Sequence, residues 1–140
     1  MKPIPYAAII IKNSEGEILL VLCESKSTSL YPKHWTLVGG KVGPVETPDL
    51  AAQRQLEEET GLKSNLSFWK RYERHHPLFI IDQHIFTCKV DDSQSLLVLG
   101  RDAQFFKPSE VTHLKIGYGF KDLLQEYLLR EIDHLYVHHA

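Results

Sequence analysis

Short runs of apolar and β-branched residues alternate along the chain with polar or glycine-containing stretches. Residues 6–12 form a nearly continuous apolar run, which is typical of a strand covered on both faces. The same strand-like composition recurs over residues 17–24, 34–38, 66–73, 78–90 and 96–106, the last of which has room for two short strands. Residues 25–33 are polar and predict a loop.

Helical spacing of apolar positions predicts two longer helices. The first begins after Thr47, a good N-cap with proline at the next position, and ends at Gly61, where a left-handed cap is expected. The apolar residues that this helix offers for burial are Leu50, Ala51, Ala52 and Leu56. The second helix covers residues 118–136, and residues 108–113 predict a single helical turn. We interpret Gly39-Gly40, which precede the first helix, as a turn.

This order of elements predicts an α/β (α+β) fold in which a mixed sheet lies between helices. The 140 residues have the length of one ordinary domain, so we expect residues 1–140 to form a single domain with a full core.

The composition of the chain excludes some classes of function. The chain has 43% hydrophobic and 24% charged residues, which are globular values. The formal net charge of −2 provides no basic footprint, so we expect no nucleic acid polymer as a partner. The apolar runs are too short to span a bilayer, and no signal peptide is visible, so no membrane partner is expected. Cys23 and Cys88 lie in apolar runs and are interpreted as buried free thiols, which favours a cytoplasmic location.

The last turns of the first predicted helix carry Glu57-Glu58-Glu59. Carboxylates at a helix C-terminus oppose the helix dipole. Helical spacing also brings Gln55, Glu58 and Glu59 onto one face, where a cation would neutralise them. The alternative for such a short motif, taken alone, is a solvated acidic helix end without function.

The residues around this cluster favour a functional site. Residues 40–62 resemble the Nudix box, G-x5-E-x7-R-E-U-x-E-E-x-G-U, in which U is a bulky aliphatic residue. The matching positions, all with the spacing of the motif, are Gly40, Glu46, Arg54, Leu56, Glu58, Glu59, Gly61 and Leu62. One position departs from the motif, because Gln55 follows Arg54 where the family carries glutamate.

The resemblance implies a Nudix-type α/β/α sandwich and a pyrophosphohydrolase in which water attacks phosphorus. It also implies Mg²⁺ as the cofactor, with Mn²⁺ as the alternative, because oxygen ligands suit these hard cations. By position, the family's metal ligands correspond to Glu58, Glu59 and the carbonyl of Gly39. Arg54 and Glu46 match residues that support the loop and orient the carboxylates. We add Gly40, Lys41 and Trp35 as candidate substrate-binding residues, since glycine permits close backbone approach and an indole can stack on a base.

Gln55 leaves the catalytic base open, because an amide cannot accept a proton. In some Nudix proteins a carboxylate from a later loop is the base. Asp91, Asp92 and Asp102 lie in the corresponding region, although aspartate there is also a common turn residue. Leu99 stands where relatives often carry glutamate. The sequence thus allows an attenuated enzyme or a catalytically weakened domain that binds a nucleotide or nucleotide sugar as a sensor.

The sequence indicates only a broad class of substrate. The resemblance implies a nucleoside diphosphate linked to a further group, as in a nucleoside triphosphate, ADP-ribose or a nucleotide sugar. Pro77 lies near the position of a proline found in ADP-ribose-cleaving relatives, but a turn before a strand explains it equally well. The amphipathic last helix allows either a monomer or a homodimer.

Overall fold

The structure, a computed structural model, describes residues 2–23, 31–91 and 102–139 of the chain, with side chains up to residue 131. Its strands and helices follow the predicted order. They are β1 (Ile4–Lys12), β2 (Ile18–Leu22), β3 (Trp35–Thr36), β4 (Val38–Lys41), α1 (Pro48–Thr60), β5 (Ser67–His76), β6 (Phe79–Lys89), β7 (Ala103–Phe106), α2 (Pro108–Val111) and α3 (Phe120–His139).

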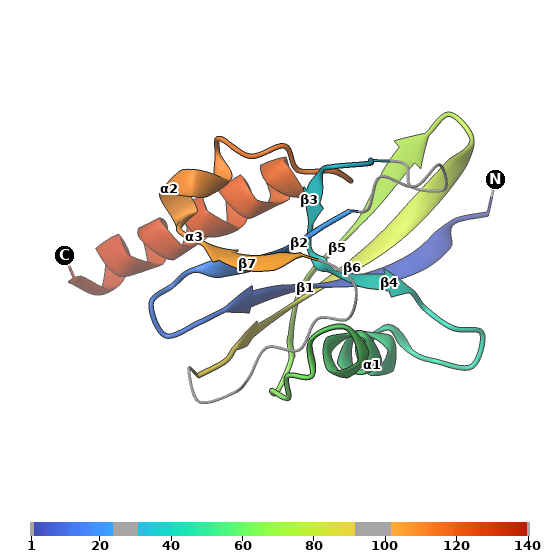
Figure 1. The fold of residues 1–140 in the computed structure, drawn as a ribbon, viewed down its shortest axis with the longest axis horizontal. Coiled ribbons are helices and arrows are strands. Elements are labelled where there is room, and N and C mark those ends of the chain that lie inside the picture. Colours follow the sequence, from blue (N-terminus) through green and yellow to red (C-terminus); the bar gives the residue numbers. More distant parts are fainter. Residues whose placement is uncertain (1, 24–30, 92–101, 140) are drawn as a thin grey trace.

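The strands form one mixed sheet with the order β3-β2-β1-β6-β5, while β4 pairs with β1 and β7 pairs with β2 (Figure 1). The central pair, β1 and β6, is parallel and runs from Ile4 opposite Ile81 to Lys12 opposite Lys89. All other strand pairs are antiparallel. The continuous apolar run of β1 is explained by this central position, because both of its faces are covered.

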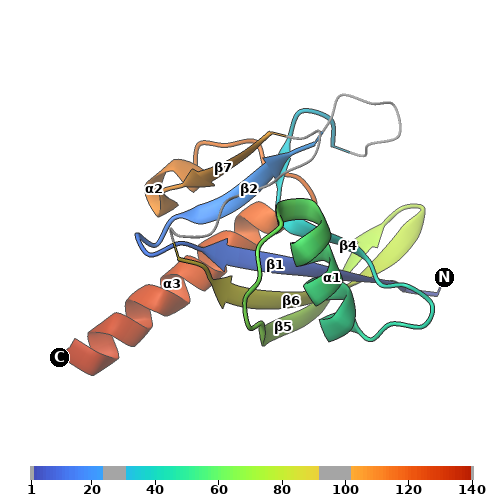
Figure 2. The ribbon, with the colours of Figure 1, turned by 60° about the horizontal axis from the view of Figure 1, so that its bottom comes forward.

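Helices cover both faces of the sheet, which confirms the predicted layers (Figures 1 and 2). Side chains of β1 alternate between two apolar clusters. Ala7, Ile9 and Ile11 pack with Leu56 of α1, and Ala8 and Ile10 pack with α3 on the other face. A strand directs successive side chains to opposite faces, so one apolar strand serves both halves of the core.

The predicted turn at Gly39-Gly40 is wrong, because both glycines lie within β4. Gly39 is opposite Ala8 and Gly40 is opposite Ala7 in the antiparallel pair with β1. A Cβ atom on Gly39 would overlap the carbonyl oxygen of Ala7 and lie 2.8 Å from the Cα of Ala8. The glycine is therefore used for close approach of two backbones rather than for a turn.

The predicted limits of α1 agree with the structure, but its buried face differs from the prediction. Gly61 has a left-handed backbone (φ 72°), and its N–H donates to the carbonyl of Glu57. Leu50 is 58% exposed, so its expected burial is wrong. The buried residues are Ala51, Ala52, Leu56 and Thr60. Positions 52, 56 and 60 repeat every fourth residue and share one face, from which Leu50 is turned away.

The two cysteines are buried free thiols, as predicted. No helix in the part of the chain that the structure describes is long and apolar enough to cross a membrane.

Candidate active site

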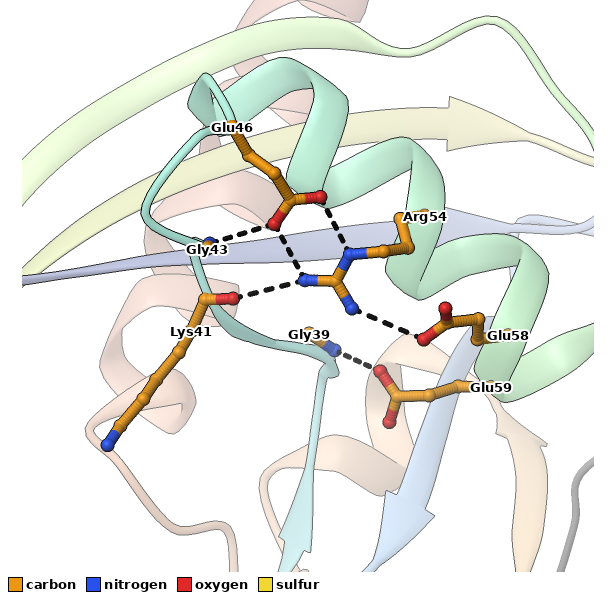
Figure 3. Close-up of polar contacts among 7 residues, drawn as sticks. All are labelled: Gly39, Lys41, Gly43, Glu46, Arg54, Glu58 and Glu59. Atoms are coloured by element: carbon orange, nitrogen blue, oxygen red, sulfur yellow. Dashed lines mark hydrogen bonds and ion pairs between the residues drawn. The ribbon is translucent and has the colours of Figure 1, made fainter.

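The motif residues converge where the C-terminal half of α1 faces β4 (Figure 3). The guanidinium of Arg54 binds Glu46 through two bonds, Nε to Oε2 at 2.7 Å and Nη2 to Oε1 at 2.9 Å. The backbone N–H of Gly43 donates to the same carboxylate at 2.8 Å. Glu46 therefore fastens the connection between β4 and α1 to the helix through a bidentate pair, a strong and directional geometry.

Arg54 also holds one of the acidic residues near the end of α1. Its Nη1 donates to Glu58 Oε2 at 3.2 Å, one helical turn further on. Its Nη2 donates to the carbonyl of Lys41 at 3.3 Å. A single guanidinium thus joins β4, the connection and the helix, and it fixes the position of the otherwise exposed carboxylate of Glu58.

Glu59 is held from the other side by the backbone of β4. Its Oε2 accepts the N–H of Gly39 at 3.0 Å, as the dashed line in Figure 3 marks. The end of Gln55 lies close to the same strand, since a Cβ on Gly40 would be 2.5 Å from its Nε2. The two glycines, Gln55 and Glu59 consequently form one contact between strand and helix.

These hydrogen bonds change the acidity of the Arg54–Glu46 pair. The side-chain bond from Arg54, and secondarily the backbone bond from Gly43, lowers the pKa of the Glu46 carboxyl. The bond to Glu46 raises the pKa of Arg54 in return. Both groups are therefore charged at neutral pH, and the pair keeps its geometry there.

Replacing Glu46 by glutamine is expected to destabilise the protein at pH 7 but much less at pH 3. The pKa of Glu46 is lower in the folded state than in the unfolded state. Its stabilising contribution is therefore complete above the unfolded pKa of about 4.3 and is lost as the pH falls through the folded value. Urea unfolding of wild type and variant from pH 7 to pH 3 measures the difference.

The control for this experiment is an Arg54→Met background, which removes the largest cause of the pKa shift. There, the cost of Glu46→Gln is expected to be smaller at pH 7 and to depend little on pH. An equal cost at all pH values with Arg54 present would contradict the ion pair as the source.

The donor atoms at this site suit a hard divalent cation. Glu58 and Glu59 offer carboxylate oxygens, and the backbone of Gly39 adjoins Glu59 through its N–H. Across residues 2–23, 31–91 and 102–131, no three His, Cys, Asp or Glu side chains cluster closely enough to hold a metal by themselves. Mg²⁺ commonly takes one or two carboxylates and completes its shell with water and substrate phosphates, so a site with two glutamates fits this cation.

A cavity of about 290 Å³ adjoins the acidic site and shares two residues with it, Gly39 and Gly40. The other lining residues are mostly apolar or aromatic and come from several strands and the start of α3. They are Tyr6, Ala7, Ala8, Cys23, Thr36, Leu37, Gln83, Tyr118 and Phe120. None of these lining residues is charged. The volume is near the lower limit for a small-molecule site, and the composition suits a flat organic group.

Two predicted substrate-binding residues lie away from these features. The side chain of Lys41 is exposed and extends away from Glu58 and Glu59 (Figure 3). Trp35 is not among the residues that line the cavity, and its ring packs edge-on against Phe106 with centroids 4.8 Å apart. Gly40, in contrast, lines the cavity. Pro77 lies in the two-residue turn between β5 and β6.

The candidate bases after β6 are only partly described. Asp91 and Asp102 are exposed, and the carbonyl of Asp102 accepts the N–H of Leu22 at 2.8 Å. Asp92 and Leu99 lie outside the described residues.

Most of the cavity wall, including Tyr6, Gln83, Tyr118 and Phe120, is not among the site residues predicted from the sequence. One residue in the sequence, Gln83, could have indicated the cavity. Gln83 shares one face of β6 with the apolar residues Ile81 and Ile85, and it is 2% exposed. A buried amide within a central strand indicates a polar function at that point.

Comparisons with known proteins agree with the fold and with the motif. The model of the NUDIX domain family matches residues 2–127. Diphosphoinositol polyphosphate phosphohydrolase 3-alpha of Mus musculus is 32% identical over 119 residues, or 81% of this chain and 68% of that protein. The MutT protein of Methanosarcina mazei Go1 superposes with a TM-score of 0.80 at 19% identity, covering 93% and 96% of the two chains. The E. coli ORF135 protein superposes with a TM-score of 0.75 at 26% identity, covering 92% and 91%.

Proposed function

Because this chain belongs to the NUDIX family, we propose that it hydrolyses the phosphoanhydride bond of a nucleoside diphosphate linked to a second group, with Mg²⁺ as cofactor. One observation carries the proposal. Arg54 and the N–H of Gly39 hold the carboxylates of Glu58 and Glu59 beside a cavity that shares Gly39 and Gly40 with them. The phosphohydrolase activity in the name of the Mus musculus relative supports the same reaction class.

The site residues have two roles: some would bind the cation, and others keep its ligands in place. Glu58, Glu59 and the carbonyl of Gly39 would hold the divalent cation. Arg54 and Glu46 are positioning residues, because the bidentate bond between them fixes the guanidinium that binds Glu58. The cation would neutralise diphosphate oxygens and make a nearby water more acidic.

The reaction itself is a displacement at phosphorus. The water oxygen forms a bond to one phosphorus, the bridging P–O bond breaks, and the leaving phosphoryl group departs with the bridging oxygen. A carboxylate must accept the proton of the water, and the amide of Gln55 cannot do so. We therefore assign this role to a carboxylate other than position 55, with Asp91, Asp92 and Asp102 as candidates outside the box.

The cavity favours a nucleoside over an inositol ring as the group next to the diphosphate. A diphosphoinositol polyphosphate carries many phosphates, which are normally bound by arginine and lysine. None of the described residues that line the cavity is charged, whereas Tyr6, Tyr118 and Phe120 offer aromatic surface for a base. We therefore propose a nucleoside triphosphate, ADP-ribose or a nucleotide sugar as the substrate.

The proposal is tested by measuring Mg²⁺-dependent release of phosphate or nucleotide from a panel of nucleoside triphosphates, ADP-ribose and nucleotide sugars. A diphosphoinositol polyphosphate is included as the alternative class of substrate. Turnover of a nucleotide is the expected result. Turnover of the inositol compound alone would overturn the substrate class. No turnover of any compound by wild type and by Gln55→Glu would overturn the reaction.

Replacing Gln55 by glutamate is expected to raise kcat by about tenfold. Gln55 already lies against Gly40, next to the carboxylates. A glutamate there would add a proton acceptor in the position of the family motif and recover part of the roughly 10²–10⁴-fold that a general base contributes. Steady-state rates of wild type and Gln55→Glu on the best substrate measure this. A lower rate in the variant would contradict it.

Gln55 also supports a second candidate function, a sensor that binds a nucleotide without cleaving it. Its marks are Mg²⁺-enhanced nucleotide binding without turnover in wild type and the appearance of turnover in Gln55→Glu. Calorimetry with the same panel separates this function from the enzyme.

We also propose a cytoplasmic location and a monomer or homodimer. Burial raises the pKa of the Cys88 thiol to about 11, which keeps it protonated and poorly reactive in a reducing compartment.

A further inference from the structure

The amide of Gln83 lies in the centre of the sheet, on the face that carries α3. Its side chain is 2% exposed and lines the cavity beside Gly39 and Gly40. Its Oε1 is buried and accepts no hydrogen bond from any residue that the structure describes. A buried carbonyl without a donor is costly, and natural proteins rarely keep one without a purpose.

The neighbours of Gln83 across the sheet do not satisfy it. Tyr6 of β1 and Tyr72 of β5 are its register partners on either side. The Tyr72 hydroxyl is also buried without a partner among the described residues, and burial raises its pKa to about 12, so it remains protonated. Two adjacent strands, β5 and β6, thus carry two buried unpaired polar groups, Tyr72 Oη and Gln83 Oε1, on residues that are partners in the strand register.

The shape and polarity of the cavity define what can supply the missing bonds. Its aromatic residues Tyr6, Tyr118 and Phe120 suit a flat ring, and no charged side chain lines it in the part of the chain that the structure describes. In either orientation, a side-chain amide presents one donor and one acceptor in one plane. The complementary edge is an exocyclic amine beside an unprotonated ring nitrogen, and adenine offers it in the way that glutamine reads adenine in DNA. On the corresponding edge hypoxanthine presents two acceptors, O6 and N7, so the amide can complete only one of the two bonds.

We propose that Gln83 is a specificity-determining residue that selects adenine-containing substrates by pairing its amide with the exocyclic amine and N7 of the base. This inference rests on the proposed function for the position of the diphosphate at Gly39 and Gly40. The hydrogen bonds to the base themselves require no hydrolysis.

Binding of nucleoside monophosphates tests the inference separately from the reaction, because these compounds have no phosphoanhydride bond. Calorimetry without divalent cation compares AMP with IMP, which differ in the exocyclic amine. We expect AMP to bind roughly tenfold more tightly than IMP, the effect of about one hydrogen bond.

The decisive variant is Gln83→Met, which keeps the length of the side chain and removes both polar atoms. It is expected to bring the AMP/IMP affinity ratio close to one and to leave the thermal midpoint equal or higher, because an unsatisfied buried amide is lost. Gln104 is an exposed glutamine on β7, so Gln104→Met is the matched control and should keep the wild-type ratio.

Three results would overturn the inference. These are equal binding of AMP and IMP by wild type, an unchanged ratio in Gln83→Met, and no binding of either monophosphate at millimolar concentration. Failure of the hydrolysis panel with intact discrimination in this experiment would overturn the proposed reaction and leave the role of Gln83 standing.

Discussion

Replacing Glu59 by glutamine is expected to lower kcat/KM by about 10³-fold. A bound cation contributes several kcal/mol of charge stabilisation in such reactions, and each 1.4 kcal/mol corresponds to about tenfold in rate. The amide removes the negative charge but keeps an oxygen that can accept the N–H of Gly39, the bond that Glu59 makes at 3.0 Å. The strand–helix contact should therefore persist while the affinity for Mg²⁺ or Mn²⁺ falls.

Glu57 provides the matched control, because it is an exposed neighbour on the same helix. Glu57→Gln makes the same chemical change and is expected to retain activity within about twofold, as surface substitutions usually do. Steady-state kinetics and calorimetric titration with Mn²⁺ should separate the two variants. Equal activity of Glu59→Gln and wild type would remove Glu59 from the catalytic site.

Replacing Gly39 by alanine is expected to destabilise the protein by about 3 kcal/mol, the upper range for overpacking a core. The new methyl group would overlap the carbonyl of Ala7 and lie 2.8 Å from the Cα of Ala8, and both are backbone atoms of the central strand. Relief requires β4 to separate from β1, which would also move the N–H that binds Glu59. Stability and activity should therefore fall together, and urea unfolding with steady-state kinetics measures both.

Gly16→Ala is the control for this substitution. Gly16 has a positive φ of 76°, but a Cβ there would meet no atom within 4 Å. Its cost should be limited to backbone strain, about 1 kcal/mol, with full activity. If Gly39→Ala cost no more than Gly16→Ala, the close approach of β4 to β1 would be contradicted.

Local patterns were sufficient to predict most of the elements. The cap residues of α1 determined its limits, and alternation or continuous apolarity identified β1, β5 and β6. The prediction of a turn at Gly39-Gly40 was wrong because pairing with another strand determines the backbone conformation there. Gly39-Gly40 has the composition of a turn, yet pairing with β1 makes it a strand, and a sequence window around the glycines contains no information about β1.

The site also has a part that local sequence predicts and a part that depends on tertiary structure. Glu46, Arg54, Glu58 and Glu59 belong to one continuous stretch, so the spacing of the motif brings them together and predicts their convergence. The cavity is built from Tyr6, Gln83 and Tyr118, which come from three distant segments. Their proximity follows from sheet order, which no local pattern specifies. Trp35 was selected for its aromatic ring alone, and its packing against Phe106 depends on the pairing of β2 with both β3 and β7.

The parallel pairing of β1 with β6 has a consequence for how this chain reaches its native state. Every residue of β1 has its partner 77 positions later, as with Ile4 and Ile81. During synthesis β1 is made before β6 and must wait for the chain through Lys89 before its parallel neighbour exists. The β5–β6 hairpin and α1, in contrast, can form from local contacts. We expect folding to be limited by insertion of β1 between β2 and β6, and unfinished chains that stop before β6 to be the species most prone to aggregation.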